Sequence, residues 1–189
     1  MTIEDYKKII RPFMGEHRYT HSVNVAKEAV RLAQKYGADV KKAETAGILH
    51  DITKEFSPEE QLQIMHDGGI ILDDIQQKAP KLWHSLSGSV YIKSKLNIND
   101  DDIINAVRYH TTGRANMSLL EKIIFVADFT SAERSYDGVK TMRKLADKSI
   151  EKAMLFGFKF TFCDLSSREL AIHPDEIACY NQIVLSNSK

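Results

Sequence analysis

The sequence predicts an all-α fold in a single domain of 189 residues. Three observations support this prediction: apolar residues recur at helical spacing, capping signals precede several of these segments, and hairpin dipeptides between alternating strands are missing. A chain of this length can bury a continuous core without disulfides or a structural metal. We therefore expect residues 1–189 to form one helical domain.

Three helices are marked in the N-terminal third of the chain. Residues 22–36 place alanine and valine on one face at helical spacing and end at Gly37, a natural C-cap. Asp39 can cap a second helix that runs to about residue 51. Residues 57–60, SPEE, combine an N-cap serine, proline at the first helical position and glutamate at the third, and predict a third helix that ends near residue 67.

Further helices are expected along the remainder of the chain, at about 84–96, 100–110, 119–132, 139–163 and 174–186. Pro80 precedes the first of them, the sequence SLLE at 118–121 is a capping box, and Pro174 can open the last. The stretches 66–83 and 111–117 are expected to be loops.

Composition excludes several classes of protein. Lys+Arg and Asp+Glu balance at 26 each, which argues against a nucleic-acid partner. No stretch approaches the roughly 18 apolar residues of a membrane span, and the N-terminus lacks the features of a secretory signal. The two cysteines, Cys163 and Cys179, are expected to be small buried hydrophobes in a reducing compartment. We therefore expect a cytoplasmic protein with no membrane partner.

Histidine and aspartate residues carry the chemical signal. Five of the seven histidines fall at helix starts or ends: His21, His50, His84, His110 and His173. Asp51 directly follows His50, and Asp128 interrupts the apolar run at 122–129, where burying an ionised carboxylate is costly unless it is paired or binds a cation. His17 and His66 are expected to be surface or capping residues.

Each of these residues alone has a structural explanation. A single histidine at a helix end is more often a cap than a ligand, and Asp128 alone could be a salt-bridged core residue. The series His, His-Asp, His, His, Asp on successive helices is harder to explain in that way. Separate helices of a bundle can deliver mixed imidazole and carboxylate ligands to one point, so the series predicts a divalent metal site.

The same series resembles the HD superfamily of metal-dependent phosphohydrolases, from His21 to Asp128, and that family is all-α. The segments RYTHS at 18–22, GILHDITK at 47–54, LWHS at 82–85, RYHTTGR at 108–114, SLLEKI at 118–123, AD at 127–128, ER at 133–134 and IHP at 172–174 look like those of the bacterial YqeK group, which are symmetrical bis(5′-nucleosyl)-tetraphosphatases.

The resemblance implies an HD core at about 18–134, with C-terminal helices completing a nucleotide pocket. It implies a metal held by His21, His50, Asp51 and Asp128, and either a second metal or a phosphate facing His84 and His110. The metal would be iron, as one or two ions, the substrate diadenosine tetraphosphate, the product ADP, and the assembly a homodimer.

Catalytic and nucleotide-binding residues are expected around this metal. The catalytic set is Asp51, Lys54, His84, His110 and Arg134. The nucleotide-binding set is Arg18, Lys54, His84, His110, Thr111, Asp128, Arg134, Ile172, His173 and Pro174. Lys54, Arg134 and Arg18 could each be a solvated helix-end cation, and the threonines after His110 could simply end a helix.

Two other functions are compatible with the same residues. One keeps the metal site but acts on another nucleotide, as a nucleotidase or phosphodiesterase. The other is a nucleotide-sensing regulator without catalysis, although degenerate members of the family usually lose ligands that are all present here. Product analysis and binding without turnover would distinguish the three.

Overall fold

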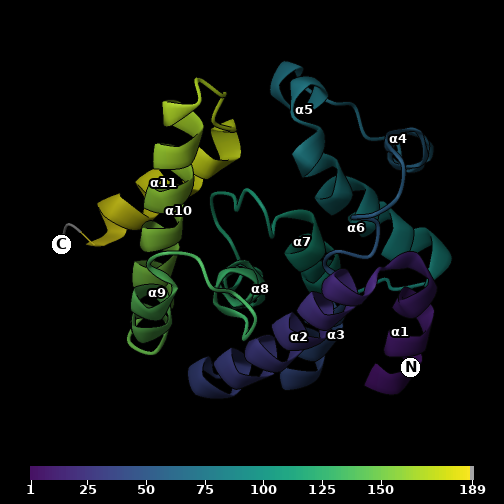
Figure 1. Ribbon diagram of the computed structural model, residues 1–189, viewed down its shortest axis with the longest axis horizontal. Coiled ribbons are helices and arrows are strands. Elements are labelled where there is room, and N and C mark those ends of the chain that lie inside the picture. The colour runs from purple at the N-terminus through teal and green to yellow at the C-terminus, as the bar shows by residue number, and fades with distance from the viewer. Residues whose placement is uncertain (188–189) are drawn as a thin grey trace.

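The computed structural model of the protein describes residues 1–187, and this part of the chain is helical with no strand, as the sequence predicts (Figure 1). Its α-helices are α1 (Ile3–Ile10), α2 (Glu16–Tyr36), α3 (Val40–Leu49), α4 (Pro58–Asp67), α5 (Asp74–Lys78), α6 (Trp83–Lys95), α7 (Asp101–Arg108), α8 (Leu119–Thr130), α9 (Val139–Ala146), α10 (Ile150–Ser167) and α11 (Pro174–Asn187). Two short 3-10 helices lie at Arg11–Phe13 and Pro80–Leu82. No helix within residues 1–187 is both long and apolar enough to cross a membrane.

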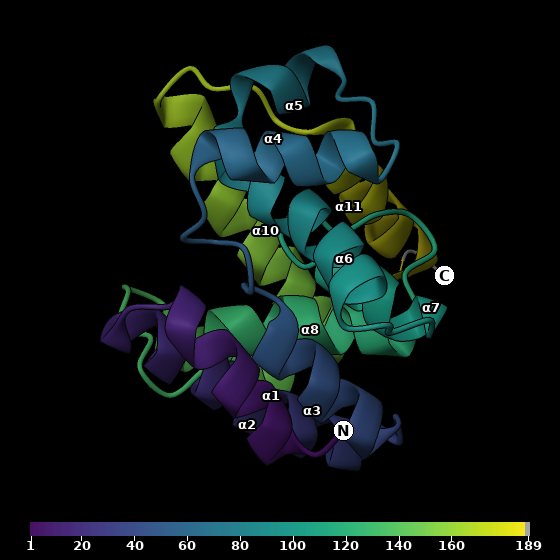
Figure 2. The same cartoon turned by 90° about the vertical axis from the view of Figure 1, so that its right-hand side faces the viewer.

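Helix α8 occupies the centre of the fold and packs against α2, α3, α7, α9 and α10. Figures 1 and 2 show three groups around it: α1 to α3 on one side, α4 to α6 on another, and α9 to α11 on a third. The first two groups contribute His21, His50 and His84, whereas His110 follows α7 and Asp128 lies in α8. The interior of the bundle is therefore where these residues can meet.

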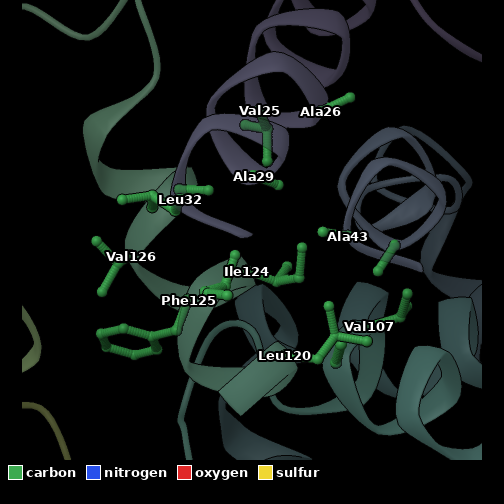
Figure 3. Packing of buried hydrophobic residues seen from close by; sticks show 14 of the residues in the cluster. Val25, Ala26, Ala29, Leu32, Ala43, Val107, Leu120, Ile124, Phe125 and Val126 are labelled. Carbon is green, nitrogen blue, oxygen red and sulfur yellow. The ribbon is translucent and has the colours of Figure 1, made fainter. Parts of the chain in front are cut away.

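Buried apolar side chains hold α2, α3, α7 and α8 together. Val25 and Leu32 of α2, Val107 of α7, and Ile124 and Phe125 of α8 are at most 1% exposed and pack in one cluster (Figure 3). Burial of a side chain of this size contributes roughly 1.5–3 kcal/mol relative to leaving it exposed. The helices that carry the site are thus fixed by the core rather than by loops.

A glycine sets the distance between α2 and α3. A Cβ at Gly47 would lie 2.8 Å from Cα and 3.1 Å from N of Ala26, both backbone atoms. Real Cβ atoms essentially never approach this closely, so the two helices can pack at this separation only with glycine at position 47. Gly47 lies three residues before His50, so this close crossing also places His50 and Asp51 beside α2.

The predicted helix signals operate as expected. Gly37 ends α2 in the left-handed conformation at φ 76°, and its N–H donates to Ala33 O. The Ser57 and Ser118 side chains cap α4 and α8 through complete capping boxes.

Three predictions of local structure were wrong, and one helix was missed. Helix α2 begins at Glu16, not near residue 22, and α1 was not anticipated although Thr2 and Asp5 form a capping box. The predicted helix 139–163 is two helices, because Ser149 accepts from Lys152 N and starts α10 anew. The predicted loop 66–83 contains α5 and a 3-10 turn, started by a capping box of Asp73 and Gln76.

The cysteines do not behave alike. Cys179 is buried, and burial raises the pKa of its thiol to about 11, whereas Cys163 is exposed on α10, contrary to expectation. His17 and His66 are exposed, as predicted.

Candidate metal centre

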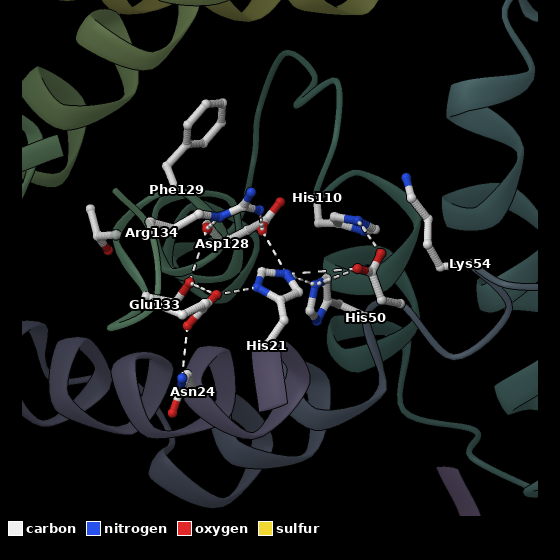
Figure 4. A network of polar contacts seen from close by, with 12 residues as sticks. His21, Asn24, His50, Lys54, His110, Asp128, Phe129, Glu133 and Arg134 are labelled. Atoms are coloured by element: carbon white, nitrogen blue, oxygen red, sulfur yellow. Dashed lines mark hydrogen bonds and ion pairs between the residues drawn. The ribbon is translucent and has the colours of Figure 1, made fainter. Parts of the chain in front are cut away.

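Five helices bring the predicted His and Asp residues to one point. His21 lies in the second turn of α2, His50 is the C-cap of α3, and Asp51 follows it. His84 lies in the first turn of α6, His110 two residues after α7, and Asp128 in the last turn of α8 (Figure 4 shows most of them). The four rings and Asp51 are at most 3% exposed, and the side chain of Asp128 is 18% exposed.

One half of the cluster surrounds Asp51 Oδ2. His50 Nε2 lies 3.4 Å from this oxygen and 3.2 Å from His21 Nε2. His21 Nε2 lies 3.0 Å from Asp128 Oδ1 and 3.7 Å from Asp51 Oδ2. The four residues predicted to bind the first metal therefore point their donor atoms at one another.

The other half surrounds the second oxygen of the same carboxylate. His84 Nε2 lies 3.2 Å and His110 Nε2 3.6 Å from Asp51 Oδ1, and the two ring nitrogens are 3.1 Å apart. Asp51 thus turns one oxygen to each histidine pair, which is the arrangement expected of a carboxylate that can bridge two positions.

Hydrogen bonds at Nδ1 fix three of the rings. His50 Nδ1 lies 2.8 Å from Gly47 O, and His110 Nδ1 lies 2.7 Å from Val107 O, so each must carry the proton there. His21 Nδ1 faces the Glu133 carboxylate and donates to it. The Nε2 lone pairs of all three rings are therefore directed into the cluster, as ligation requires.

This donor set fits a divalent cation. The Nε2 atoms of His21 and His50 are both acceptors in these tautomers, yet they face each other and two carboxylates at hydrogen-bond distance. Converging lone pairs repel unless a positive charge lies between them, and imidazole with carboxylate suits first-row divalent ions. The cluster is consistent with a divalent metal site.

The pKa shifts of the cluster residues also indicate that the pocket favours positive charge. Burial lowers the pKa of His21, but the Asp128 and Glu133 carboxylates beside the ring outweigh it and raise the pKa above its ordinary value. Burial opposes ionisation of Asp51 and Asp128, but the neighbouring rings, and Arg134 beside Asp128, hold both pKa values well below the usual range. The pocket therefore keeps its carboxylates ionised and favours added positive charge.

Three cationic side chains line the cluster. Arg18 pairs with Asp51 Oδ2, and Arg134 pairs with Asp128 Oδ1 while its Nε donates to Asp128 O at 2.9 Å. Lys54 Nζ lies 3.1 Å from His84 Nδ1, and burial lowers the pKa of this amine. Burial also lowers the pKa of His84 to about 4, so this ring is neutral at pH 7.

The remaining predicted residues lie to the side of the cluster. Thr111 is half-buried and donates to Ser85 Oγ at 3.2 Å. His173 is buried and lies 3.1 Å from Gln76 Nε2, whereas Ile172 is half-buried and Pro174 is exposed where it opens α11.

His173 lines a cavity of about 50 Å³. The other lining residues come from α5, α6 and the 3-10 turn before it, the end of α7 and the segment after it, and α11; they are Gln76, Leu82, Ser85, Leu86, Arg108, Tyr109, Thr112 and Asp175. Pockets for small molecules generally measure about 300–1,000 Å³. The Gln76–His173 contact would therefore have to open before a nucleoside could enter there.

The sequence did not predict that two polar residues, Glu133 and Asn24, would hold His21 in place. Glu133 faces His21, and Asn24 Nδ2 donates to Glu133 Oε2 at 2.8 Å (Figure 4). Glu133 and His21 are 112 positions apart, so no local pattern links them. The one available signal was that Asn24 lies three residues after His21, on the same helical face.

Comparison with known proteins agrees with this geometry. The family model described as HD domain matches residues 18–133. The chain is 36% identical over 184 residues to a symmetrical bis(5′-nucleosyl)-tetraphosphatase of Bacillus subtilis, covering 97% of this chain and 98% of the relative. It is 38% identical over 178 residues to an enzyme of the same name from Halalkalibacterium halodurans, covering 94% and 95%.

A solved structure is also similar over nearly the whole chain. It is described as a predicted HD superfamily hydrolase involved in NAD metabolism from Clostridium acetobutylicum, with a TM-score of 0.95, 36% identity, and 98% of each chain covered. The residues matched by the family model include the whole His and Asp cluster. The chain therefore belongs to the HD-domain family, in the group of the symmetrical bis(5′-nucleosyl)-tetraphosphatases.

Proposed function

We propose that this protein is a metal-dependent hydrolase that cleaves diadenosine tetraphosphate into two molecules of ADP. The observation that carries the proposal is full-length similarity to enzymes of that name together with an intact His and Asp cluster. In the reaction, water adds to an inner phosphorus and the bond from this phosphorus to the central bridging oxygen breaks. Each half leaves as ADP, so the atoms of one water are consumed.

His21, His50, Asp51 and Asp128 would hold one divalent cation, and Asp51 Oδ1 with His84 and His110 would hold a second where two are bound. A cation bound there supplies a nucleophile at neutral pH and positive charge for the phosphoryl oxygens. Burial of the rings and of Asp51 excludes bulk water, which strengthens every charge interaction in the pocket.

Lys54, Arg18 and Arg134 would bind the tetraphosphate. Each has its charged group beside the cluster, paired with His84, Asp51 and Asp128 respectively. An Arg fork matches two phosphate oxygens, and charge-assisted hydrogen bonds are about twice as strong as neutral ones. These groups would orient the inner phosphorus and stabilise the departing diphosphate.

The nucleoside would lie between the segment after His110 and the start of α11, with Thr111, Ile172, His173 and Pro174 as its contacts. Asp128 would face the nucleotide as well as the metal, because it is the more exposed of the two carboxylates. The C-terminal helices would thereby complete a pocket on the HD core of residues 18–134, within one domain.

Finer properties are proposed from the family resemblance. We infer iron as the native metal, since a His and Asp set without thiolate admits first-row ions. We also infer a homodimer that acts in the cytoplasm.

The test is incubation of metal-reconstituted protein with diadenosine tetraphosphate and separation of the products by chromatography, beside an Asp51→Ala variant. ADP as sole product, lost in the variant, supports the proposal. ATP with AMP, or an untouched substrate, would overturn it.

A further inference from the structure

The Glu133 carboxylate is held at the edge of the metal centre by three hydrogen bonds. Its Oε1 accepts from His21 Nδ1 and from Ser131 Oγ at 2.7 Å, and its Oε2 accepts from Asn24 Nδ2 at 2.8 Å. Asn24 comes from α2 (Figure 4), and Ser131 directly follows α8. The carboxylate thus ties the helix that carries His21 to the helix that carries Asp128.

The position of Glu133 excludes direct action on a substrate. It contacts the Nδ1 side of His21, whereas Nε2 on the other side of the ring faces Asp51, Asp128 and His50. An imidazole ring therefore separates Glu133 from the point where a reacting atom would lie.

His21 differs from the other fixed rings in the kind of partner it uses. His50 and His110 donate to the backbone carbonyls of Gly47 and Val107, which are neutral, whereas His21 donates to a carboxylate. A charged acceptor fixes the tautomer and also makes the opposite nitrogen a stronger donor to a cation. Because this partner is a side chain, it can be changed without moving the backbone.

We propose that Glu133 is the positioning residue of the metal centre, which orients His21 and increases its basicity, with Asn24 and Ser131 holding the carboxylate in place. This inference rests on the proposed metal site. It assigns to Glu133 no contact with substrate and no proton transfer to it.

The test measures Mn²⁺ binding by calorimetry in the absence of nucleotide, in the full-length protein and in Glu133→Gln. Loss of an outer carboxylate partner generally weakens metal binding by about 10–100-fold, and we expect that loss here. Glu28→Gln is the matched control. Glu28 is also a shielded carboxylate on α2, 14% exposed, and accepts from Thr130 and Arg31, but it has no contact with the cluster.

Two further variants cover the case in which Glu133→Gln fails to fold. Asn24→Ala and Ser131→Ala keep the carboxylate but each removes one hydrogen bond that holds it, a loss of about 1 kcal/mol, so each should weaken Mn²⁺ binding by roughly 5-fold. The melting temperature of each metal-free variant measures any structural effect separately.

Unchanged Mn²⁺ affinity in the Glu133→Gln variant, or an equal loss in Glu28→Gln, would overturn the inference, as would a wild-type protein that binds no Mn²⁺. Nucleotide turnover is assayed independently. Glu133-dependent Mn²⁺ binding without cleavage of diadenosine tetraphosphate would leave this inference standing and remove the proposed function. Cleavage of diadenosine tetraphosphate together with unaltered Mn²⁺ binding in Glu133→Gln would support the proposed function and remove this inference.

Discussion

Replacing Gly47 by alanine is expected to damage metal binding far more than it damages stability. The added Cβ would lie 2.8 Å from Ala26 Cα, about 0.6 Å short of the 3.4 Å at which ordinary contact begins. Because the obstacle is backbone, α2 and α3 must separate by about that amount. His50 lies three residues after Gly47 and His21 five residues before Ala26, so the separation acts directly on this histidine pair.

Two opposing terms set the change in stability. Overpacking costs about 1–3 kcal/mol. Alanine in place of a glycine inside a helix recovers about 1 kcal/mol, which leaves a net loss of about 0–2 kcal/mol. A functional site tolerates only about 0.5 Å of displacement, and a shift of 1 Å can cost about 100-fold. We therefore expect Mn²⁺ affinity and turnover to fall by about 10–100-fold.

Urea unfolding of the metal-free protein and calorimetric Mn²⁺ titration measure the two effects separately. Gly88→Ala is the control: Gly88 is a buried helical glycine, but a Cβ there would meet its nearest neighbour, Val107 Cγ1, at an ordinary 3.4 Å. The reasoning is refuted if Gly47→Ala binds Mn²⁺ as the wild type does, or if Gly88→Ala loses as much.

Three more predictions follow from the structure. Burial raises the pKa of Glu176 to about 7 from 4.5. The protonated carboxyl therefore stabilises the folded state fully below about pH 4.5. The free energy of unfolding falls by ~3 kcal/mol as the pH rises from there to about 7. In the Glu176→Gln variant, urea unfolding across this range should show no such fall in the free energy of unfolding. An equal fall in the variant would contradict the raised pKa of Glu176. Adding Mn²⁺ at 100 times its Kd should stabilise the protein by about 2.7 kcal/mol and raise its melting temperature by about 5–10 °C, reversibly with chelator. Asp51→Asn should abolish that rise in thermal melts, and an undiminished rise would place the ion elsewhere. Arg134→Ala should lower kcat/KM for diadenosine tetraphosphate by about 10–100-fold, as expected for a lost charge-assisted hydrogen bond to phosphate. Wild-type steady-state kinetics in that variant would exclude Arg134 from substrate binding.

Helix boundaries were predictable where a capping signal adjoined a clear apolar pattern. Gly37, Ser57 and Ser118 end or start helices as their residue types dictate. The break between α9 and α10 was missed because the apolar pattern continues through it, and only the Ser149 cap interrupts the helix. The α5 turn was missed because a short helix in a polar stretch has almost no periodicity to detect.

The candidate site was predictable in its residues but not in its contacts. The His and Asp series identified the residues that the structure brings together, because their order along the chain is distinctive. The division of Asp51 between two histidine pairs depends on where five helices converge, which no spacing reveals. The Glu133 contact with His21 likewise depends on the packing of α8 against α2.

The rings of His50 and His110 follow one local rule. Each lies at the C-terminal end of its helix and donates Nδ1 to the carbonyl three residues earlier, Gly47 O or Val107 O. Carbonyls in the last turn of a helix lack an intrahelical partner, so a single hydrogen bond satisfies the backbone and aims the ring. Four consecutive residues at a helix end are thus sufficient to orient each histidine ring. Transplanting such helix ends into an unrelated bundle would require only that the new scaffold bring them together.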